Sequence, residues 1–483
     1  MINKLNKIEW LNFLWLMAMG LIIAGMSLKI CRMAHCFVFG ADHINRPIPE
    51  MILYLGIWFI AYFLALERIR KINHADSAKM NLTWILFVSV VIRIVFFPPH
   101  LIQETDPYRY LWDGQAVVQG ANPYRLSPQE AYSLNENPAV SKDKNIRATF
   151  EHINFPDVKT IYPPMAQYLF AISQYLTPWS LLGWKWMIMI ADALIIGILL
   201  ALLGRMKIRA EWILLYAWSP LILKEFYNSM HLDVFSLLFL SLMIYALIRG
   251  WGALAFIFLS CATMVKWFSL ILLPLLILAT SNRIRKNFLN ISLFLGVAVS
   301  LYLPFMSAGR YLWEGLMTFT LNWRINEGLF SLILFCIQTL HFSEGLTKLI
   351  TRLIAGIIFL GISLAVLSWY SRKRDNYSFF QAGLILTSSL FFLIPTGNPW
   401  YFTWIFPFLV FFPWRSLIFF SGLVLLYYLD FYFIYQDQRH LYNWIRLIEY
   451  GVFFSFLGYE LWKDRQLPLL SRFTTRAVSL ERR

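Results

Sequence analysis

The segment 104–114, ETDPYRYLWDG, contains the acidic residues of this sequence that are best placed for chemistry. It follows an apolar run, and an acidic side chain there, beside aromatic rings and an arginine, is partly dehydrated while its charge remains balanced. A general base, which removes a proton from a hydroxyl group, needs this environment. A helix starting after Pro107 would place Arg109 and Asp113 on one face, where Asp113 can hold Arg109 in a fixed pose. The alternative for Asp106 is structural, because Asp followed by Pro is a common helix start and the side chain could only cap that helix.

Other ionisable side chains lie at the ends of apolar segments, where a charge near lipid is costly and marks either a site or a buried pair. Lys266 separates two short apolar runs, so its ammonium group would lie at a helix break and could bind a phosphate. His231 and Asp233 lie in a tight turn, where a structural histidine is the alternative. Arg324 lies at a similar segment end, close to Glu327.

An acidic residue and several cations suit the transfer of a group away from a phosphate carried by a lipid. The carboxylate would remove a proton from an acceptor hydroxyl, and the cations would stabilise the charge on the departing phosphate. Trp400 and Tyr401, in the aromatic turn 396–404, could stack on a sugar ring, although such residues are most often membrane anchors. The sequence contains no Walker glycine loop and no dinucleotide fingerprint.

The elements that must position these residues are membrane helices. Hydrophobic residues make up 59% of the 483 residues and charged residues only 14%, which is more apolar surface than a soluble core can bury. We expect one all-α polytopic membrane domain over residues 1–483, with about 12–14 transmembrane helices. The apolar runs lie near 9–29, 51–66, 82–98, 184–204, 211–226, 234–249, 253–265, 267–280, 288–305, 349–370, 377–394, 401–413, 416–435 and 442–462.

The basic residues indicate how these helices are oriented. If the amino terminus is cytoplasmic, simple alternation places every basic cluster on the cytoplasmic side, which explains the net charge of +15 without nucleic acid as a partner. The clusters lie at 68–71, 205–209, 283–286 and 372–374, and in a basic cytoplasmic tail at 463–483.

The same orientation makes the segment 99–163 an extracytoplasmic loop, the longest polar connection in the sequence. Loops of this length are usually functional or disordered, and its aromatic residues favour folding against the membrane. An amphipathic stretch at 165–175 follows it and reads as a juxtamembrane helix. A transporter or flippase of lipid-linked sugars is the alternative function, but it would place charges at mid-bilayer, whereas these gather at the outer surface.

Four segments of the loop together resemble the loop of bacterial GT-C glycosyltransferases, with the closest similarity to family 87 and related polyprenyl-phosphate-dependent mannosyltransferases. They are DPYRYLWDG at 106–114, GANPY at 120–124, NFPD at 154–157 and TIYPPMAQ at 160–167. Looser matches follow in the expected order at 218–220, 231–233, 266 and 399–401. One departure is that two spans precede the span before the loop, whereas many relatives place the loop after their first span.

The resemblance implies a GT-C-like fold and an enzyme of the bacterial inner membrane that acts on the periplasmic side. It would transfer a hexose, mannose by preference, from a polyprenyl-phosphate donor to a glycan or lipid acceptor, with inversion at the anomeric carbon. It implies no cofactor and leaves a divalent metal open. By position, the catalytic residues would be Asp106 as the base, Glu104 as its nearest rival and Asp113 as a supporting or second acid. The phosphate-binding candidates are Arg109, His231, Lys266 and Arg324, and the substrate-binding candidates are Tyr108, Tyr162, Asp233, Trp400 and Tyr401.

Overall fold

The computed structural model describes residues 7–38, 40, 42–71, 78–98, 100–134, 144–280 and 283–466. Helices dominate these ranges, which contain no strand, and one isolated β-bridge joins Ile325 to Thr396. The all-α class is confirmed. Of the predicted basic tail at 463–483, everything from 467 onward lies outside the described residues.

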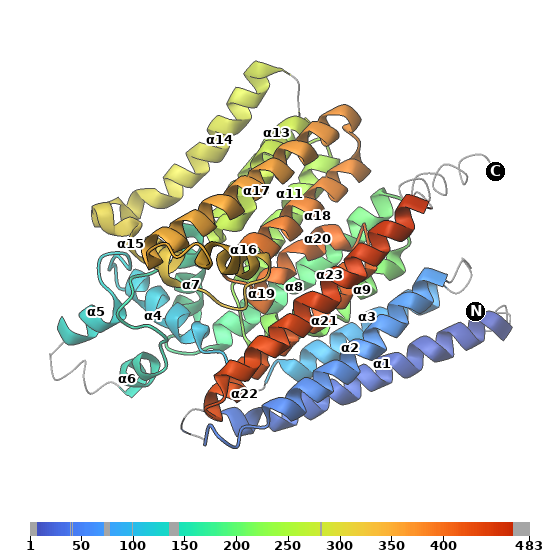
Figure 1. Cartoon of the computed structure of the whole chain (residues 1–483), viewed down its shortest axis with the longest axis horizontal. Coiled ribbons are helices and arrows are strands. Elements are labelled where there is room, and N and C mark those ends of the chain that lie inside the picture. The colour runs from blue at the N-terminus through green and yellow to red at the C-terminus, as the bar shows by residue number, and fades with distance from the viewer. Residues whose placement is uncertain are drawn as a thin grey trace.

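Long apolar helices form the body of the molecule (Figure 1). Within the described ranges, seven elements are long and apolar enough to cross a membrane, which confirms a multi-pass membrane protein, while the count of 12–14 spans remains a prediction. They are α1 (Lys7–Met33), α2 (Ile48–Lys71), α3 (Ala78–Phe96), α8 (Leu182–Arg205), α14 (Ile284–Tyr302) with its extension to Leu312, α17 (Glu344–Lys373), and α21 (Arg415–Leu423) with α22 (Leu429–Tyr435). Shorter apolar helices are α11 (Asp233–Ile248), α12 (Gly252–Val265), α13 (Leu273–Thr280) and α16 (Leu329–Gln338).

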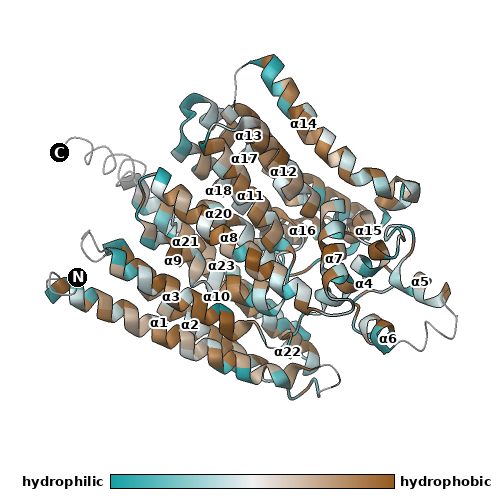
Figure 2. Ribbon diagram, turned by 180° about the vertical axis from the view of Figure 1, so that it is seen from behind, coloured by the Kyte–Doolittle hydropathy of each residue, from teal (hydrophilic) through white to brown (hydrophobic). Residues whose placement is uncertain are grey.

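Helix α2 shows why these segments need both a protein interior and a bilayer. Its buried residues, such as Leu55, Trp58 and Tyr62, recur every three or four positions and form one stripe that packs inward. The opposite side of the helix is apolar as well, with Leu53 and Ile60 each 58% exposed. Figure 2 shows the same pattern across the molecule, with hydrophobic colour along the long helices and hydrophilic colour toward their ends.

Two predicted apolar runs, 211–226 and 401–413, are not continuous α-helices. The first divides into α9 (Leu214–Ala217), α10 (Pro220–Ile222) and a π-helical turn, Leu223–Asn228, because Pro220 has no N–H for the helical ladder. The second divides into α19 (Pro399–Phe402), a 3-10 turn and α20 (Phe406–Leu409). Continuous spans over these two runs are therefore a wrong prediction.

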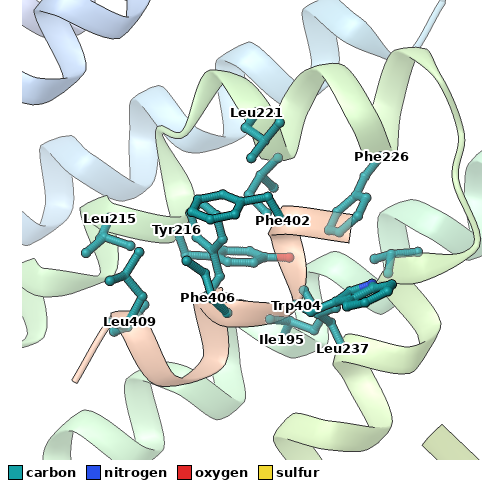
Figure 3. Packing of buried hydrophobic residues seen from close by; sticks show 14 of the residues in the cluster. Ile195, Leu215, Tyr216, Leu221, Phe226, Leu237, Phe402, Trp404, Phe406 and Leu409 are labelled. Carbon is teal, nitrogen blue, oxygen red and sulfur yellow. The ribbon is translucent and has the colours of Figure 1, made fainter. Parts of the chain in front are cut away.

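The two broken segments pack against each other at the centre of the core, where Tyr216, Leu221, Phe402 and Phe406 are fully buried (Figure 3). A broken helix leaves carbonyl groups without partners, which is costly away from water. Side chains of α2 satisfy two of them: Trp58 donates to the carbonyl of residue 218 and Tyr62 donates to that of residue 215, at 2.9 and 2.7 Å. The core therefore holds irregular backbone in place.

The connections between the helices lie at the two ends of the bundle. Arg70 donates to the carbonyl of Pro413 at 2.8 Å, and Arg209 donates to that of Ile69 at 2.6 Å, so the basic clusters at 68–71 and 205–209 and the connection at Pro413 meet at one end. In Figure 1 the start of α1 and the end of α23 (Tyr442–Gln466) lie at this end. The segment after α3 folds at the opposite end as α4 (Asp106–Val118), α5 (Pro128–Leu134), α6 (Lys144–Glu151) and α7 (Pro164–Leu176). The stretch 165–175 is helical, as predicted, and its juxtamembrane position stays a prediction.

Candidate active site

A cavity of about 840 Å³ lies at the end of the bundle that carries α4. Its lining includes charged side chains, such as Asp106 and Arg109, and apolar ones, such as Leu316 and Phe319 of α15 (Glu314–Asn322). Further apolar lining comes from Leu390 and the segment that follows α18 (Asn376–Leu393). The cavity thus combines charged groups with apolar side chains suited to a hydrocarbon chain.

Asp106 is the first residue of α4 and its carboxylate lines the cavity, with the side chain 30% exposed. Thr105 is the N-cap residue and no side-chain hydrogen bond caps this helix, so the purely capping interpretation finds no support. The Asp106 carboxylate lies 3.8 Å from Nδ1 of His231. Burial raises the pKa of Asp106 to about 6, against the opposing effect of the Lys266 ammonium group. A carboxyl with this pKa is largely ionised at neutral pH and suits a general base.

His231 lies behind this carboxylate and not on the cavity surface. It is fully buried, stacks on the Trp400 ring with 3.8 Å between centroids, and places Nε2 3.4 Å from a Glu225 carboxylate oxygen. Neither ring nitrogen has a hydrogen-bond partner in the structure. This position suits orientation of Asp106 better than contact with a phosphate.

Lys266 lies at a helix break, as the sequence predicted: α12 ends at Val265 and residue 266 has extended backbone. Its ammonium group lines the cavity and donates to both carboxylate oxygens of Asp233, at 2.8 and 2.7 Å. Trp404 donates to the same carboxylate at 2.6 Å, and the ammonium group lies 4.1 Å from the centroid of the Tyr401 ring. Asp233 is not on the cavity wall, so it would act on a substrate only through Lys266.

Arg109 and Asp113 form the predicted pair on α4, with Nε 2.8 Å from Oδ1. One terminal nitrogen of Arg109 donates to the carbonyl of Val158, while the other, Nη2, is buried without a partner on a residue that lines the cavity. Asp113 itself is buried away from the cavity, so it supports Arg109 and does not face a substrate. Gly114 is required next to it, because a Cβ there would lie 2.4 Å from the carbonyl oxygen of Phe170 on α7.

The remaining predicted residues divide between the cavity wall and other surroundings. Glu104, Tyr162, Trp400, Tyr401 and Arg324 all line the cavity. Burial and the nearby Asp106 carboxylate raise the pKa of Glu104 well above its usual value. Tyr108 does not line the cavity and stacks on His152 at 4.3 Å between centroids.

Several cavity residues were not predicted from the sequence: Lys159, Asn398, Asp430 and Arg439. Arg439 and Asp430 form a two-point ion pair at 3.1 and 3.2 Å. Asn398 lies in the aromatic turn that drew attention to Trp400, so its neighbours were a usable signal. The other three carry no local pattern that distinguishes them from ordinary surface charges.

The C-terminal helix α23 secures the loop that carries Arg324. Asn326, three residues before α16, accepts from the Tyr442 hydroxyl at 2.8 Å and donates to Glu449 at 3.0 Å. The Tyr450 hydroxyl donates to the carbonyl of Asn326 at 2.6 Å. This loop and the Asn398 turn also share the β-bridge, so two distant segments form one edge of the cavity.

Among the described residues, no group of three or more histidine, cysteine, aspartate or glutamate side chains is arranged to hold a metal ion. Comparison with curated proteins gives no match, and neither does comparison with solved structures. Residues 14–282, more than half of the chain, match the family described as alpha-(1->6)-mannopyranosyltransferase, N-terminal domain. Family membership identifies an enzyme, and so decides between the glycosyltransferase and the transporter that the sequence left open. The chain belongs to the alpha-(1->6)-mannopyranosyltransferase family and is a membrane mannosyltransferase.

Proposed function

We propose that this enzyme transfers mannose from a polyprenyl-phosphate donor to a hydroxyl group of a glycan or lipid acceptor, with inversion at the anomeric carbon. The observation that carries the proposal is the position of Asp106, a carboxylate with a raised pKa on a cavity whose lining combines charged and apolar side chains. The segment 99–163 is then the catalytic loop of a single membrane domain. The active site faces the periplasmic side of a bacterial inner membrane.

The reaction follows from the placement of these groups. Asp106 removes the proton from the acceptor hydroxyl while the oxygen attacks the anomeric carbon, and the bond from that carbon to the phosphate oxygen breaks. Arg109 offers the partnerless Nη2 to the departing phosphate, and Arg324 and Lys266 add positive charge nearby. The proton stays on Asp106 until it is released to water.

The lipid portion of the donor would lie along the apolar side chains of the cavity lining. Leu316 and Phe319 line the cavity from α15, and Leu390 and Ile394 line it from the end of α18. Apolar side chains at this depth suit a prenyl chain, whose transfer out of water is favourable by about 0.8 kcal/mol per buried methylene group.

A donor comparison with the purified full-length protein tests this function. Polyprenyl-phosphate-mannose and GDP-mannose are offered separately with a panel of lipid and mannan acceptors, and products are identified by mass spectrometry. We expect transfer from the lipid-linked donor alone, with the α-linkage that inversion of a β-linked donor gives. Transfer from GDP-mannose alone would contradict the proposed donor.

The orientation is tested separately by cysteine labelling in a variant without the four native cysteines. Gln129→Cys in α5 and Asn376→Cys at the start of α18 lie at opposite ends of the bundle. We expect a membrane-impermeant reagent added outside the cell to label only Gln129→Cys. Labelling of Asn376→Cys alone would place the active site in the cytosol.

A further inference from the structure

Four residues of the cavity wall have a buried polar side-chain atom without a hydrogen-bond partner: the hydroxyl of Tyr110, Oε1 of Glu104, Nη2 of Arg109 and Oδ1 of Asn398. Glu104, Arg109 and Asn398 are only 5%, 8% and 2% exposed. A buried polar atom without a partner is destabilising by about 1–3 kcal/mol, so each one needs an explanation. All four residues line the space where the substrate would lie, and a bound ligand would satisfy such atoms.

The chemistry of these atoms indicates which part of the donor each would meet. Nη2 of Arg109 can only donate, which matches a phosphate oxygen. The amide oxygen of Asn398 can only accept, and neither an ionised phosphate diester nor a prenyl chain can donate to it. A sugar hydroxyl can both donate and accept, and it is the group of the donor that fits both Asn398 and the carboxyl of Glu104.

The position of the two residues agrees with this division. Glu104 precedes Asp106 by two residues, and Asn398 precedes Trp400 by two residues. Trp400 stacks on His231, and His231 lies next to the Asp106 carboxylate. Glu104 and Asn398 therefore lie on two separate chain segments that both reach the surroundings of the catalytic carboxylate.

The Asn398 side chain interacts with the Tyr401 side chain, but its amide oxygen has no partner in the fold. Asn398 is the N-cap residue of α19, but its side chain makes no capping hydrogen bond. The backbone around it is fixed by other contacts, since the N–H of Gly397 donates to the carbonyl of Ile325 at 2.7 Å. A Cβ at Gly397 would lie 2.2 Å from the carbonyl oxygen of Asn326. The side chain is therefore held in place with its oxygen left for a ligand.

We propose that Glu104 and Asn398 form the subsite that binds hydroxyl groups of the transferred hexose, and that they determine which hexose the enzyme accepts. This inference rests on the proposed function and deepens it. A site built to bind a hydroxyl group rejects a substrate that lacks it by a large factor, because the site's own polar atom is then left buried and unpaired. The subsite would thus bind individual hydroxyl groups of the sugar and discriminate against hexoses that lack them.

The test uses polyprenyl-phosphate-mannose and its 2-, 3-, 4- and 6-deoxy analogues with the wild type, Asn398→Ala and Glu104→Leu. For the wild type we expect at least one deoxy donor to be used about 100-fold or more less efficiently, measured as kcat/KM. Asn398→Ala should lower kcat/KM for the mannose donor by a similar factor but change it little for one deoxy donor, so that discrimination at one position is lost. Glu104→Leu should abolish discrimination at a different position.

Two further variants test whether the changes in donor preference come from a disturbed structure. Glu104→Gln keeps an acceptor oxygen in place and should retain discrimination at the position that Glu104→Leu loses. Asn45→Ala, at an exposed asparagine outside the cavity, is the matched control for Asn398→Ala and should match the wild type with every donor. If Asn398→Ala does not fold, Asn398→Ser also removes the amide oxygen but keeps a polar side chain.

The outcomes separate the two proposals. A wild type that uses all deoxy donors equally well overturns the subsite, and so does an equal loss with all donors in Asn398→Ala and Glu104→Leu. A wild type that transfers no mannose from polyprenyl-phosphate-mannose, but does so from another donor, contradicts the proposed function instead.

Discussion

Two clusters of buried charge in this enzyme can be compared directly. In the first, between α3 and α8, Arg93 donates to Asp192 at 2.5 Å and to the carbonyl of Ala217 at 2.8 Å. The hydroxyl groups of Tyr216 and Tyr227 both donate to Asp192, at 2.7 and 2.9 Å. No side-chain oxygen or nitrogen of this cluster is buried without a partner.

The second cluster, around Asp106, is different. His231 has no hydrogen-bond partner at either nitrogen, and Glu104 and Arg109 each leave one atom unpaired. Buried charges that are fully paired fix a fold, whereas unpaired ones beside a cavity leave interactions for a substrate. The comparison teaches that charge at membrane depth does not identify an active site, while incomplete pairing beside a cavity does.

The largest effect is expected from a substitution that removes one ion-pair partner from the first cluster. Asp192→Ala leaves the Arg93 guanidinium buried without its counterion, which should lower the free energy of unfolding by about 3–5 kcal/mol. Thermal unfolding of the detergent-purified protein measures the change. The double variant Arg93→Met with Asp192→Leu removes both charges and should recover much of the stability; equal loss in single and double variants would contradict a paired structural role.

The next effect belongs to the second cluster. Asp106→Asn keeps the shape of the side chain but removes the base, so transfer should fall by at least about 100-fold. Its thermal stability should match or exceed that of the wild type, since burial raises the pKa of Asp106 and thus favours a neutral side chain at this position. Full activity in this variant, assayed with polyprenyl-phosphate-mannose, would remove Asp106 from its proposed role.

The pH dependence of activity and that of stability should run in opposite directions, because both depend on the protonation of Asp106. With a pKa of about 6 for Asp106, kcat/KM should be level above pH 7 and fall about tenfold per unit well below pH 6. The stability contribution has the opposite sign: because burial raises this pKa above its unfolded value, the contribution is fully present at low pH and is lost as the pH rises through 6. A pH profile of activity beside one of melting temperature shows both trends, and activity that rises with acidity would contradict the assignment.

The smallest effect concerns the edge of the cavity. Tyr442→Phe removes one hydroxyl that donates to Asn326 and should raise KM for the donor by about fivefold, with little change in kcat, because Arg324 is then less firmly placed. Tyr459→Phe on the same helix, at an exposed position, is the matched control. In an Arg324→Gln background the Tyr442→Phe change should have no further effect on KM; additive effects would show that Tyr442 does not act through Arg324.

Much of the architecture could be predicted from the sequence, because lipid-facing helices are apolar over their whole length and basic residues mark one side. The breaks at 211–226 and 401–413 were missed, since the runs remain apolar across them and only tertiary partners, such as Trp58 and Tyr62, make a broken helix tolerable. Hydropathy therefore located the segments but not their internal geometry.

The site was predictable where its residues are close in sequence. The pairing of Arg109 with Asp113 follows from helical spacing, and the break at Lys266 follows from the interruption of an apolar run. The pairing of Lys266 with Asp233 joins residues 33 positions apart, and no local pattern showed that it would turn Asp233 away from the cavity. Asn398 lies in an aromatic turn that the sequence did point to, but its own importance depends on an amide oxygen that lacks a partner only in the folded state.

The cavity wall is assembled from both halves of the chain. Asp106 and Arg109 lie within the family-matched region 14–282, whereas Arg324, Asn398 and Trp400 lie beyond it. The proposed sugar subsite therefore draws on both parts of the gene: Glu104 is encoded with the base Asp106, and Asn398 lies beyond the matched region. Exchanging the carboxyl-terminal half between relatives would then change the Asn398 side of the subsite while keeping Asp106 and Glu104.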